Sequence, residues 1–449
     1  MDTIAPKTPA TLPFAAWQSL PPAEAAREVH RRIAALPADL RTAALAWVRP
    51  ERELADELTQ IRTAGVSWLA TQISPGASKL APTAGLTFPL HGVPYLLKDL
   101  YDLAGVPTMA GSTFLDQARG RPAQGGALPR RLGELGAVCA GKTHLVEFAA
   151  GLFGDNAHYG DCPHPFFPDR VSGGSSSGSA ALVAAGVVPL AIGSDTGGSV
   201  RLPAAFCGLY GFRLSPRDDF IRDAMPLSPS LDTSGWFTTN AADMLTTIKA
   251  LVGPSTPDKE PRGCFLPAEE FGIPFDADTT AACDRAAAKF AAPADRATTT
   301  ALLAAWQGAI DAYTVTALSE AHTVHRDWLA PYRAHYEPSI WQRFSDGGRY
   351  PPEQIAQAKA VTATVRAAWR QFFADHDFLV LPCAPFPALH KADCTPEARR
   401  RILTLTTPAS LGGLPVLTIP VPLPSGLTAG LQIILPRSDS PVVPWVLNR

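Results

Sequence analysis

The stretch that decides the fold is residues 171–213, VSGGSSSGSAALVAAGVVPLAIGSDTGGSVRLPAAFCGLYGFR. It opens with a Gly/Ser-rich loop, Ser172–Ser179, followed by the small residues of Ala180–Ala185, which are typical of a tightly packed helix. The run Val187–Ile192 is apolar throughout, as expected for a strand buried on both faces, and it leads into a second loop, Gly193–Ser199. A helix followed directly by a buried strand indicates an α/β arrangement.

The rest of the chain continues this alternation of apolar strands with helices. The spacing of apolar residues predicts helices over residues 22–37, 50–72, 128–136, 279–345 and 353–374. Apolar runs predict strands over residues 93–100, 137–140, 378–382, 416–420 and 431–435. We therefore expect a layered α/β fold with a sheet that helices cover on both faces.

One change in composition divides the chain. A Pro/Gly/Ser-rich connector occupies residues 74–86. Residues 1–84 are predicted to form an N-terminal helical arm with this connector, and residues 85–449 to form the main domain. Because no internal repeat and no clean linker is present, we expect the arm and the domain to pack as one unit.

Composition excludes several classes of protein. Of the 449 residues, 46% are hydrophobic and only 18% are charged, against a usual charged share of about 25%, which indicates a large interior. The net charge is −2 and no basic stripe is present, so a nucleic-acid partner is not expected. The seven cysteines are scattered without a C-x-x-C pair, which fits neither a disulfide framework nor a zinc site.

The sequence also predicts the cellular location of the protein. The longest apolar stretch, residues 180–193, is too short and too interrupted to span a bilayer. Residues 1–18 lack the basic and apolar regions of a signal peptide. We expect a soluble, cytoplasmic enzyme without metal or cofactor, and the sequence leaves a homodimer open.

The two Gly/Ser loops hold the densest chemistry. Glycine permits positive φ and close approach of the backbone, and successive N–H groups in such a turn form a concavity that binds anions. A serine there can donate a hydrogen bond or act as a nucleophile. The alternative is a pair of tight turns with solvated serines. We favour a functional role for the serines over solvated turns, since both loops flank one helix and one buried strand.

A serine nucleophile needs a base. None of the ten histidines lies in a recognisable Ser/His/Asp context, although such partners need not be close in sequence. Lys98 is the other candidate, because it ends an apolar run and burial lowers the pKa of a lysine. The alternative is an exposed lysine at the end of a strand, paired with Asp99.

Three short motifs resemble known sites without their context. Residues 136–143 fit the P-loop pattern, but their middle residues are apolar and predict a strand. Residues 174–178 fit the nucleophile elbow, but no good strand precedes them. Residues 195–197 form the Asp-Thr-Gly of aspartic proteases, and no second copy exists in the chain. We favour none of the three.

Residues 171–213 resemble the signature of the amidase signature family of serine hydrolases. Four further segments are also similar to family blocks: HGVPYLLKDLYDLAGVPTMAGS (91–112), GAVCAGKTHLVEFAAG (136–151), LSPSLDTSGW (227–236) and ASLGGLPVLTIPVPLPSGLTAGLQIIL (409–435). The resemblance covers roughly residues 85–449 and implies a large mixed central sheet. It also strengthens the case for Lys98. Two departures are Ser177, where many members have glycine, and Arg213, where the family usually has lysine.

The resemblance implies a Ser–cis-Ser–Lys triad. Carried over by position, the nucleophile is Ser199, the bridging serine on a cis peptide bond is Ser175, and the base is Lys98. It implies hydrolysis of a carboxamide through an acyl-enzyme, with water as the second substrate. By the same resemblance, the oxyanion hole is formed by the N–H groups of Thr196, Gly197, Gly198 and Ser199. Side chains that support the loops are Ser176, Asp195 and Arg201. Residues expected to contact the substrate are Met109, Gly173 and Gly174.

Other functions stay open at this point. Within the family, the chain could be the amidase subunit of a tRNA-dependent amidotransferase, which the individual character of residues 213–220 disfavours. Outside enzymatic hydrolysis, it could be a non-catalytic binding protein on the same scaffold, or a nucleotide-using ligase built on residues 136–143.

The substrate is an amide that the sequence does not specify. Its pocket is expected from the segments around Met109, 114–160 and 300–345. Aromatic residues in the last segment weakly favour an apolar or aromatic substrate, although such residues more often belong to the core; they are Trp306, Trp328, Tyr332, Tyr336 and Trp341.

Overall fold

Three parallel strands form the part of the sheet that carries the site. The computed structural model describes residues 11–64 and 88–449. In it, β2 (Pro94–Lys98) pairs in parallel with β3 (Val138–Thr143) on one side and with β4 (Leu190–Ser194) on the other. Parallel neighbours bring their carboxyl ends to the same edge of the sheet, so Lys98 and the Gly193–Ser199 loop leave the sheet at that edge.

The described residues form one mixed sheet of eleven strands, in the order β1-β3-β2-β4-β6-β5-β10-β11-β9-β7-β8. The pairs on either side of β2, and those of β7 with β8 and β9, are parallel, and the others are antiparallel. The remaining strands are β1 (Leu45–Val48), β5 (Tyr210–Arg213), β6 (Ser234–Thr238), β7 (Gly263–Phe265), β8 (Ala292–Pro293), β9 (Phe378–Pro382), β10 (Val416–Pro422) and β11 (Thr428–Ile434).

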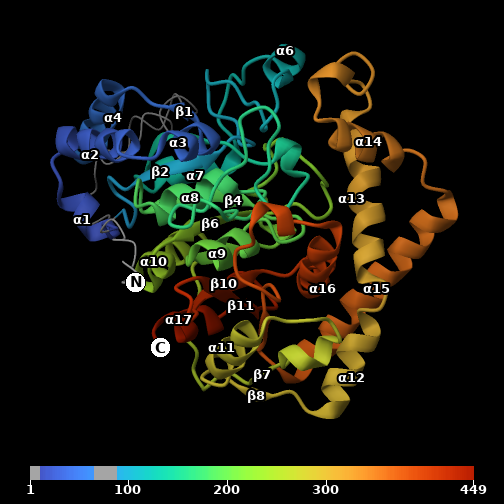
Figure 1. Ribbon diagram of the computed structural model, residues 1–449. Coiled ribbons are helices and arrows are strands. Elements are labelled where there is room, and N and C mark those ends of the chain that lie inside the picture. Colours follow the sequence, from blue (N-terminus) through green and yellow to red (C-terminus); the bar gives the residue numbers. More distant parts are fainter. Residues whose placement is uncertain (1–10, 65–87) are drawn as a thin grey trace, which may run out of the picture.

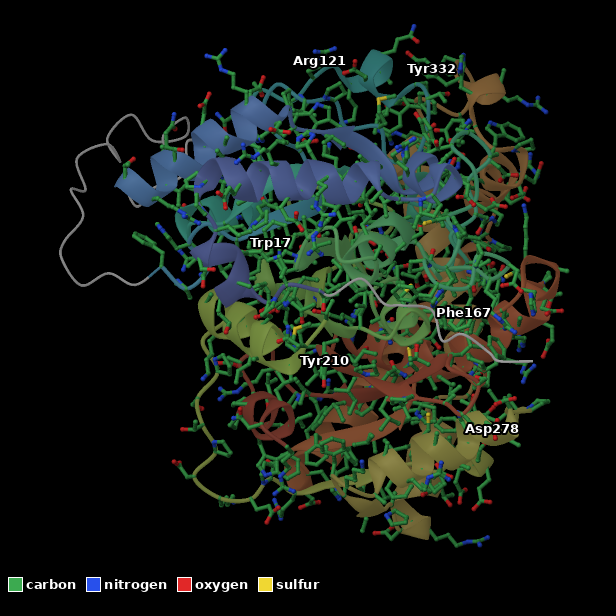
Figure 2. The ribbon with its side chains drawn as sticks, turned by 60° about the vertical axis from the view of Figure 1, so that its left-hand side comes forward. Trp17, Arg121, Phe167, Tyr210, Asp278 and Tyr332 are labelled. Carbon is green, nitrogen blue, oxygen red and sulfur yellow. The ribbon has the colours of Figure 1, made fainter. Side chains whose placement is uncertain are left out.

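Helices cover both faces of the sheet (Figure 1). Successive side chains of a strand point to opposite faces, and in β2 Leu96 joins one buried cluster while Tyr95 and Leu97 join the other. The Leu96 cluster includes residues of α2 (Pro22–Ala34), α4 (Glu51–Ala64) and α8 (Ser177–Ala184), and it contains the buried Trp17 (Figure 2). The predicted α/β/α layering is confirmed.

The cavity described below is framed by a group of C-terminal helices. α13 (Ala309–His325) packs against α14 (Pro338–Gly347), α15 (Pro352–Asp375) and α16 (Pro396–Gly412), at the right of Figure 1. The other α-helices of residues 11–64 and 88–449 are α1 (Phe14–Ser19), α3 (Ala38–Ala44), α6 (Leu115–Arg119), α7 (Ala127–Glu134), α9 (Arg201–Cys207), α10 (Ala241–Leu251), α11 (Ala277–Ala287), α12 (Arg296–Ala305) and α17 (Val442–Leu447). Among the described residues, no helix combines the length and the apolarity that crossing a membrane requires.

The N-terminal arm contributes a strand to the central sheet as well as helices. β1, which lies between α3 and α4, pairs antiparallel with β3 and so extends the central sheet. The sequence did not predict this strand, because a four-residue run between helices gives no clear period. The 74–86 connector, the boundary between residues 84 and 85, and the predicted helical residues 65–72 lie outside the described residues.

The structure corrects three predicted elements. Residues 279–345 are not one helical segment, because β8 and the left-handed Gly308 (φ 75°) interrupt them. The predicted strand 187–192 is displaced to Leu190–Ser194, since pairing with β6 continues to Ser194. The helix expected at 180–185 begins at Ser177.

Candidate active site

The amine of Lys98 lies in a fully buried cluster of serine hydroxyls. Lys98 ends β2 and has no solvent-exposed surface. Its Nζ lies 2.8 Å from Ser175 Oγ, 3.0 Å from Ser176 Oγ and 2.9 Å from Ser194 Oγ. Burial lowers the pKa of Lys98 to about 7, although the negative charges of Asp195 and Asp232 oppose the shift.

The alternative of an exposed lysine paired with Asp99 is wrong. The Asp99 carboxylate forms a buried ion pair with Lys142, at 2.5 Å. Lys142 also donates to the Pro107 carbonyl and the Thr108 hydroxyl. No salt bridge neutralises Lys98 among the described residues, and with a pKa of about 7 its amine is about half neutral at pH 7 and mostly neutral above it.

The contacts around Lys98 distinguish the three serines. The Ser176 hydroxyl donates to the Ser194 carbonyl at 3.1 Å and accepts from the Ser194 N–H at 3.2 Å. Its proton is therefore committed to the backbone. A neutral amine has two hydrogens and one lone pair, so one of its three hydroxyl neighbours must donate to it. Only Ser175 and Ser194 have a free proton to give.

The peptide bond between Gly174 and Ser175 is cis. Close packing surrounds this turn. The Gly174 N–H donates to the Leu152 carbonyl, and a β-carbon at Gly174 would lie 2.7 Å from the Gly154 nitrogen. A β-carbon at Gly173 would meet Pro203 at 3.0 Å. Both glycines thus permit close approach of neighbouring backbone.

Ser199 lies on the loop between β4 and α9, and Asp195 organises this loop. The Asp195 carboxylate accepts the N–H groups of Gly198 at 2.8 Å and Val200 at 3.0 Å. It also pairs with two fully buried guanidiniums, Arg201 at 2.8 Å and Arg213 at 2.7 Å. Burial alone would raise the pKa of Asp195, but Arg201 and Arg213 outweigh it and hold the pKa far below its usual range.

The structure corrects the predicted oxyanion hole at Gly198, because the N–H of Gly198 is already used by Asp195. The N–H groups of Thr196, Gly197 and Ser199 have no acceptor among residues 11–64 and 88–449. The Thr406 hydroxyl donates to the Gly197 carbonyl at 2.6 Å. This contact fixes the orientation of the Gly197–Gly198 peptide.

A further carboxylate holds Thr196. Asp232 accepts the Thr196 hydroxyl at 2.6 Å and the N–H groups of Leu227 and Ser228 at 2.8 and 2.9 Å. Burial raises the pKa of Asp232 to about 6, although these hydrogen bonds act to lower it. Two buried carboxylates therefore hold one short loop.

The hydroxyl of Ser199 faces a small cavity of about 70 Å³. It makes no hydrogen bond, to Ser175 or to any other residue that the structure describes. The cavity is lined by residues 149–152, by Leu227 and by residues of α13, α14 and α16. The expected segments 114–160 and 300–345 therefore do contribute to the wall.

Several expected pocket residues lie elsewhere. Met109, Gly173 and Gly174 are not among the residues that line this cavity. Nor are the five aromatic residues named above; Tyr332 and Tyr336 instead pack on Phe114, with ring centroids 4.5 and 4.8 Å apart. The aromatic residue that does line the cavity is Tyr313, which the sequence did not single out.

The look-alike motifs do not form the sites that they resemble. Residues 138–143 of the P-loop pattern are strand β3, buried throughout, as their apolar character predicted. The carboxylate of the Asp-Thr-Gly tripeptide is bound by Arg201 and Arg213 and faces no second carboxyl group within hydrogen-bond distance in the described chain. Residues 136–143 therefore do not form the phosphate-binding loop that a nucleotide-using ligase would need.

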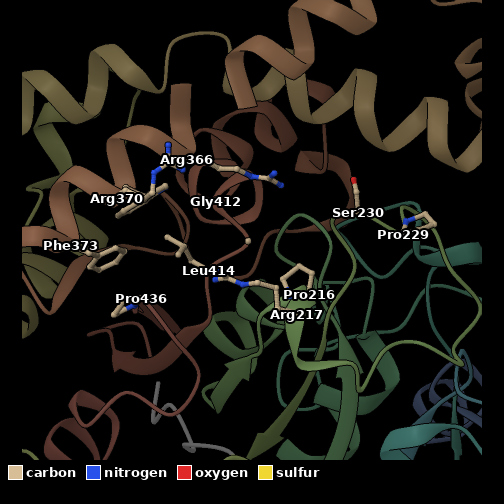
Figure 3. A pocket seen from close by; sticks show the side chains of 12 residues that line it. Pro216, Arg217, Pro229, Ser230, Arg366, Arg370, Phe373, Gly412, Leu414 and Pro436 are labelled. Carbon is tan, nitrogen blue, oxygen red and sulfur yellow. The ribbon is translucent and has the colours of Figure 1, made fainter. Parts of the chain in front are cut away.

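Two larger grooves lie away from the serine cluster. One, of about 650 Å³, is lined by Arg217 and by Arg366 and Arg370 of α15 (Figure 3). The other, of about 660 Å³, adjoins it and shares these two α15 arginines. Neither groove is lined by Lys98, Ser175 or Ser199, so volume alone does not mark the site.

Sequence reasoning missed four residues that shape the site: Ser194, Arg213, Asp232 and Thr406. Arg213 and Asp232 lie in segments that resemble the family, so their position was visible but their role was not. Thr406 comes from α16, which is more than 200 residues away from Gly197 in the chain. Nothing local in the sequence indicates such a contact.

Comparisons with known proteins identify the family of the chain. The sequence profile of the Amidase family matches residues 62–282. Over 374 residues the chain is 31% identical to AtzE, a 1-carboxybiuret hydrolase subunit from Pseudomonas sp. (strain ADP), with 77% of this chain and 80% of that protein covered. It is 29% identical to a glutamyl-tRNA(Gln) amidotransferase subunit from Methanococcoides burtonii, over 80% of this chain and 83% of that one.

Solved structures show the same fold. A crystal structure of an amidase superposes with a TM-score of 0.74 at 27% identity and covers 94% of this chain and 98% of its own. A structure from work on the origins of an s-triazine catabolic enzyme gives a TM-score of 0.78 at 26% identity, covering 96% and 95%. The chain therefore belongs to the amidase signature family and is an amidohydrolase, an enzyme that hydrolyses C–N bonds.

Proposed function

We propose that this enzyme hydrolyses a carboxamide through an acyl-enzyme on Ser199, with Ser175 as the proton relay and Lys98 as the base. The observation that carries the proposal is the buried amine of Lys98, which lies 2.8 Å from Ser175 Oγ and has a pKa of about 7. A base with a pKa near the working pH is the most effective one. Among the described residues, no histidine forms a hydrogen bond with Ser175 or Ser199.

The first half-reaction forms the acyl-enzyme. Neutral Lys98 accepts the proton of Ser175 while Ser175 accepts the proton of Ser199, and Ser199 Oγ attacks the carbonyl carbon. Ser175 then delivers a proton to the amide nitrogen and takes one back from Lys98, the C–N bond breaks, and ammonia or an amine leaves. In the second half-reaction water attacks the acyl group by the same relay, which releases the carboxylic acid and restores Ser199.

The negative oxygen of the tetrahedral intermediate needs hydrogen-bond donors. The unpaired N–H groups of Thr196, Gly197 and Ser199 support this role, and one such donor is commonly worth about 3–4 kcal/mol. Asp195, Asp232 and Thr406 keep the loop in shape. The absence of a Ser175–Ser199 hydrogen bond agrees with a free enzyme, since catalytic hydrogen bonds often tighten only when substrate binds.

The second candidate is the amidase subunit of a tRNA-dependent amidotransferase, favoured by the similarity to relatives named as subunits of glutamyl-tRNA(Gln) amidotransferase. Such a subunit would hydrolyse glutamine and pass ammonia to partner subunits. The 31% identity to a 1-carboxybiuret hydrolase subunit favours instead hydrolysis of a small amide or urea. Activity on glutamine, and co-purification with a tRNA-binding partner, separate the two candidates.

One experiment tests the proposal. The purified enzyme is labelled with a fluorophosphonate, the labelled peptide is identified by mass spectrometry, and a panel of primary amides, anilides, ureas and glutamine is assayed. We expect the label on Ser199 and the loss of hydrolysis in Ser199→Ala. The label on another residue, or full turnover by Ser199→Ala, would overturn the proposal.

A further inference from the structure

The cavity beside Ser199 has two arginines and no acid among its described lining residues. Two arginines, Arg343 of α14 and Arg399 of α16, line it together with Tyr313 of α13. The other described lining residues are small or apolar apart from Ser199 and Thr314, and none of them is an aspartate or glutamate. Two guanidiniums without a carboxylate beside them in the described lining of a small, partly desolvated space favour an anion.

Arg343 is held in place by the loop opposite. Its Nη2 donates to the Ala150 carbonyl at 2.8 Å, and Ala150 also lines the cavity. The start of α14 is fixed as well, because the Glu147 carboxylate accepts the Glu337 N–H at 2.8 Å. Asp155 and Glu337 are the acids whose charge acts on Arg343, and neither lines the cavity.

Arg399 has no partner for its side chain in the described part of the protein. Its Nε is buried without a hydrogen bond, and its guanidinium forms no ion pair among residues 11–64 and 88–449. Arg343 and Arg399 lie close enough for the positive charge of Arg399 to lower the pKa of Arg343, although burial is the larger cause. A buried donor left unpaired is costly, so this one is expected to meet a ligand.

Tyr313 lines the same cavity as these arginines, and its hydroxyl contacts the loop of Ser199. It contacts the α-carbon side of Gly197, where a β-carbon would overlap it, and it forms no hydrogen bond within the described residues. Burial raises the pKa of Tyr313, so the hydroxyl stays protonated and can donate. The cavity lining thus combines hydrogen-bond donors from Arg343, Arg399 and Tyr313 with the proposed nucleophile Ser199.

We propose that the substrate carries a carboxylate a short distance from the amide that is cleaved, and that Arg343 and Arg399 bind it. This inference rests on the proposed role of Ser199. The cavity volume of about 70 Å³ is far below the roughly 300–1,000 Å³ of pockets for drug-sized ligands, so the acyl part is short. Monoamides of small dicarboxylic acids and carboxylated ureas share this chemistry. An α-amino acid amide does not fit, because no acid would hold its ammonium group.

Malonamate and malonamide test the proposal, because they have nearly the same shape and differ in charge. We expect the wild-type enzyme to hydrolyse malonamate with a kcat/KM at least about tenfold above that of malonamide, as for the gain of a charge-assisted hydrogen bond. In Arg399→Gln we expect the kcat/KM for malonamate to fall about 10- to 100-fold, mainly through KM, because that bond is lost. The value for malonamide should change less than about threefold, since a neutral group gains little from the charge.

A neighbouring arginine provides the control. Arg400 is exposed and lies 3.8 Å from Asp311, so Arg400→Gln should leave both substrates unaffected. Equal losses for both substrates in Arg399→Gln, or a wild-type preference for malonamide, would overturn the carboxylate proposal. Labelling of Ser199 by a fluorophosphonate distinguishes a failure of the carboxylate inference from a failure of the proposed function. If Ser199 is labelled and neutral amides are preferred, only this inference fails; if Ser199 is not labelled, the proposed function fails too.

Discussion

Gly198 donates its backbone N–H to the Asp195 carboxylate at 2.8 Å, which ties the loop of Ser199 to a buried charge. The same carboxylate pairs with Arg201 and Arg213. Arg201 also donates to the Thr406 carbonyl on α16 and to Gln432 on β11. One carboxylate therefore connects the loop to elements that lie more than 200 residues away in the chain.

Asp195→Asn should destabilise the protein severely. The change leaves the buried Arg201 and Arg213 without their counter-charge, and breaking a buried pair typically costs about 3–5 kcal/mol. Urea denaturation monitored by circular dichroism measures the loss. Asp311→Asn is the control, because Asp311 is exposed, and it should change the free energy of unfolding by less than about 0.5 kcal/mol. Equal effects of both variants would contradict the role of Asp195.

Lys98→Met should change the pH dependence of stability. The pKa of Lys98 is about 7 in the folded protein and about 10.5 when it is exposed, so the unfolded chain binds more protons between these values. Stability of the wild type therefore rises with pH from 7 to 10.5, and the penalty of the lysine is complete below pH 7.

Methionine does not titrate, so the stability of Lys98→Met relative to wild type should fall by about 2 kcal/mol between about pH 7 and pH 9. Urea denaturation at both pH values measures this difference. A constant difference would show that Lys98 does not have a lowered pKa in the folded protein.

Ser175→Ala and Ser176→Ala should differ in their effect on catalysis. Both hydroxyls contact Lys98, but the proton of Ser176 is committed to the Ser194 carbonyl. We expect kcat to fall at least about 1,000-fold in Ser175→Ala, as for a member of a catalytic triad, and clearly less in Ser176→Ala. Steady-state kinetics on the best amide gives both values. A larger loss in Ser176→Ala would show that Ser175 is not the relay.

Gly197→Ala should inactivate the enzyme through Tyr313. A β-carbon at position 197 would overlap the Tyr313 hydroxyl, so the loop and its N–H groups must shift. Because a donor of an oxyanion hole is worth about 100- to 1,000-fold in kcat, we expect a loss of that size. Gly105→Ala is the control, because a β-carbon there meets nothing within 4 Å, although the positive φ of Gly105 adds some strain. Normal kcat in Gly197→Ala would contradict the assigned geometry.

The sequence predicted the parts of the site that depend on short segments. The two Gly/Ser loops and the apolar run that ends at Lys98 are local patterns, and the structure brings Lys98 and Ser175 into contact. The resemblance to the family supplied the pairing of the loops with the lysine. Layering of the sheet followed from alternation of helices and strands, which is also a local signal.

The missing parts depend on contacts between distant segments. Arg343 and Arg399 lie on different helices and meet Ser199 only through the packing of α13 against α14 and α16. β1 was missed because its pairing with β3, rather than its own four residues, makes it a strand. The N–H of Gly198 was misassigned because its acceptor, three residues earlier, is oriented by Arg201 and Arg213.

The central claim is that a neutral Lys98, acting through Ser175, activates Ser199. The most direct test is the rate at which a fluorophosphonate modifies Ser199 from acidic to mildly alkaline pH, followed by mass spectrometry of the peptide. The account predicts a rate that rises about tenfold per pH unit below about pH 7, levels off above it, and is lost in Ser175→Ala. A rate that is independent of pH over this range, or unchanged in Ser175→Ala, would contradict it.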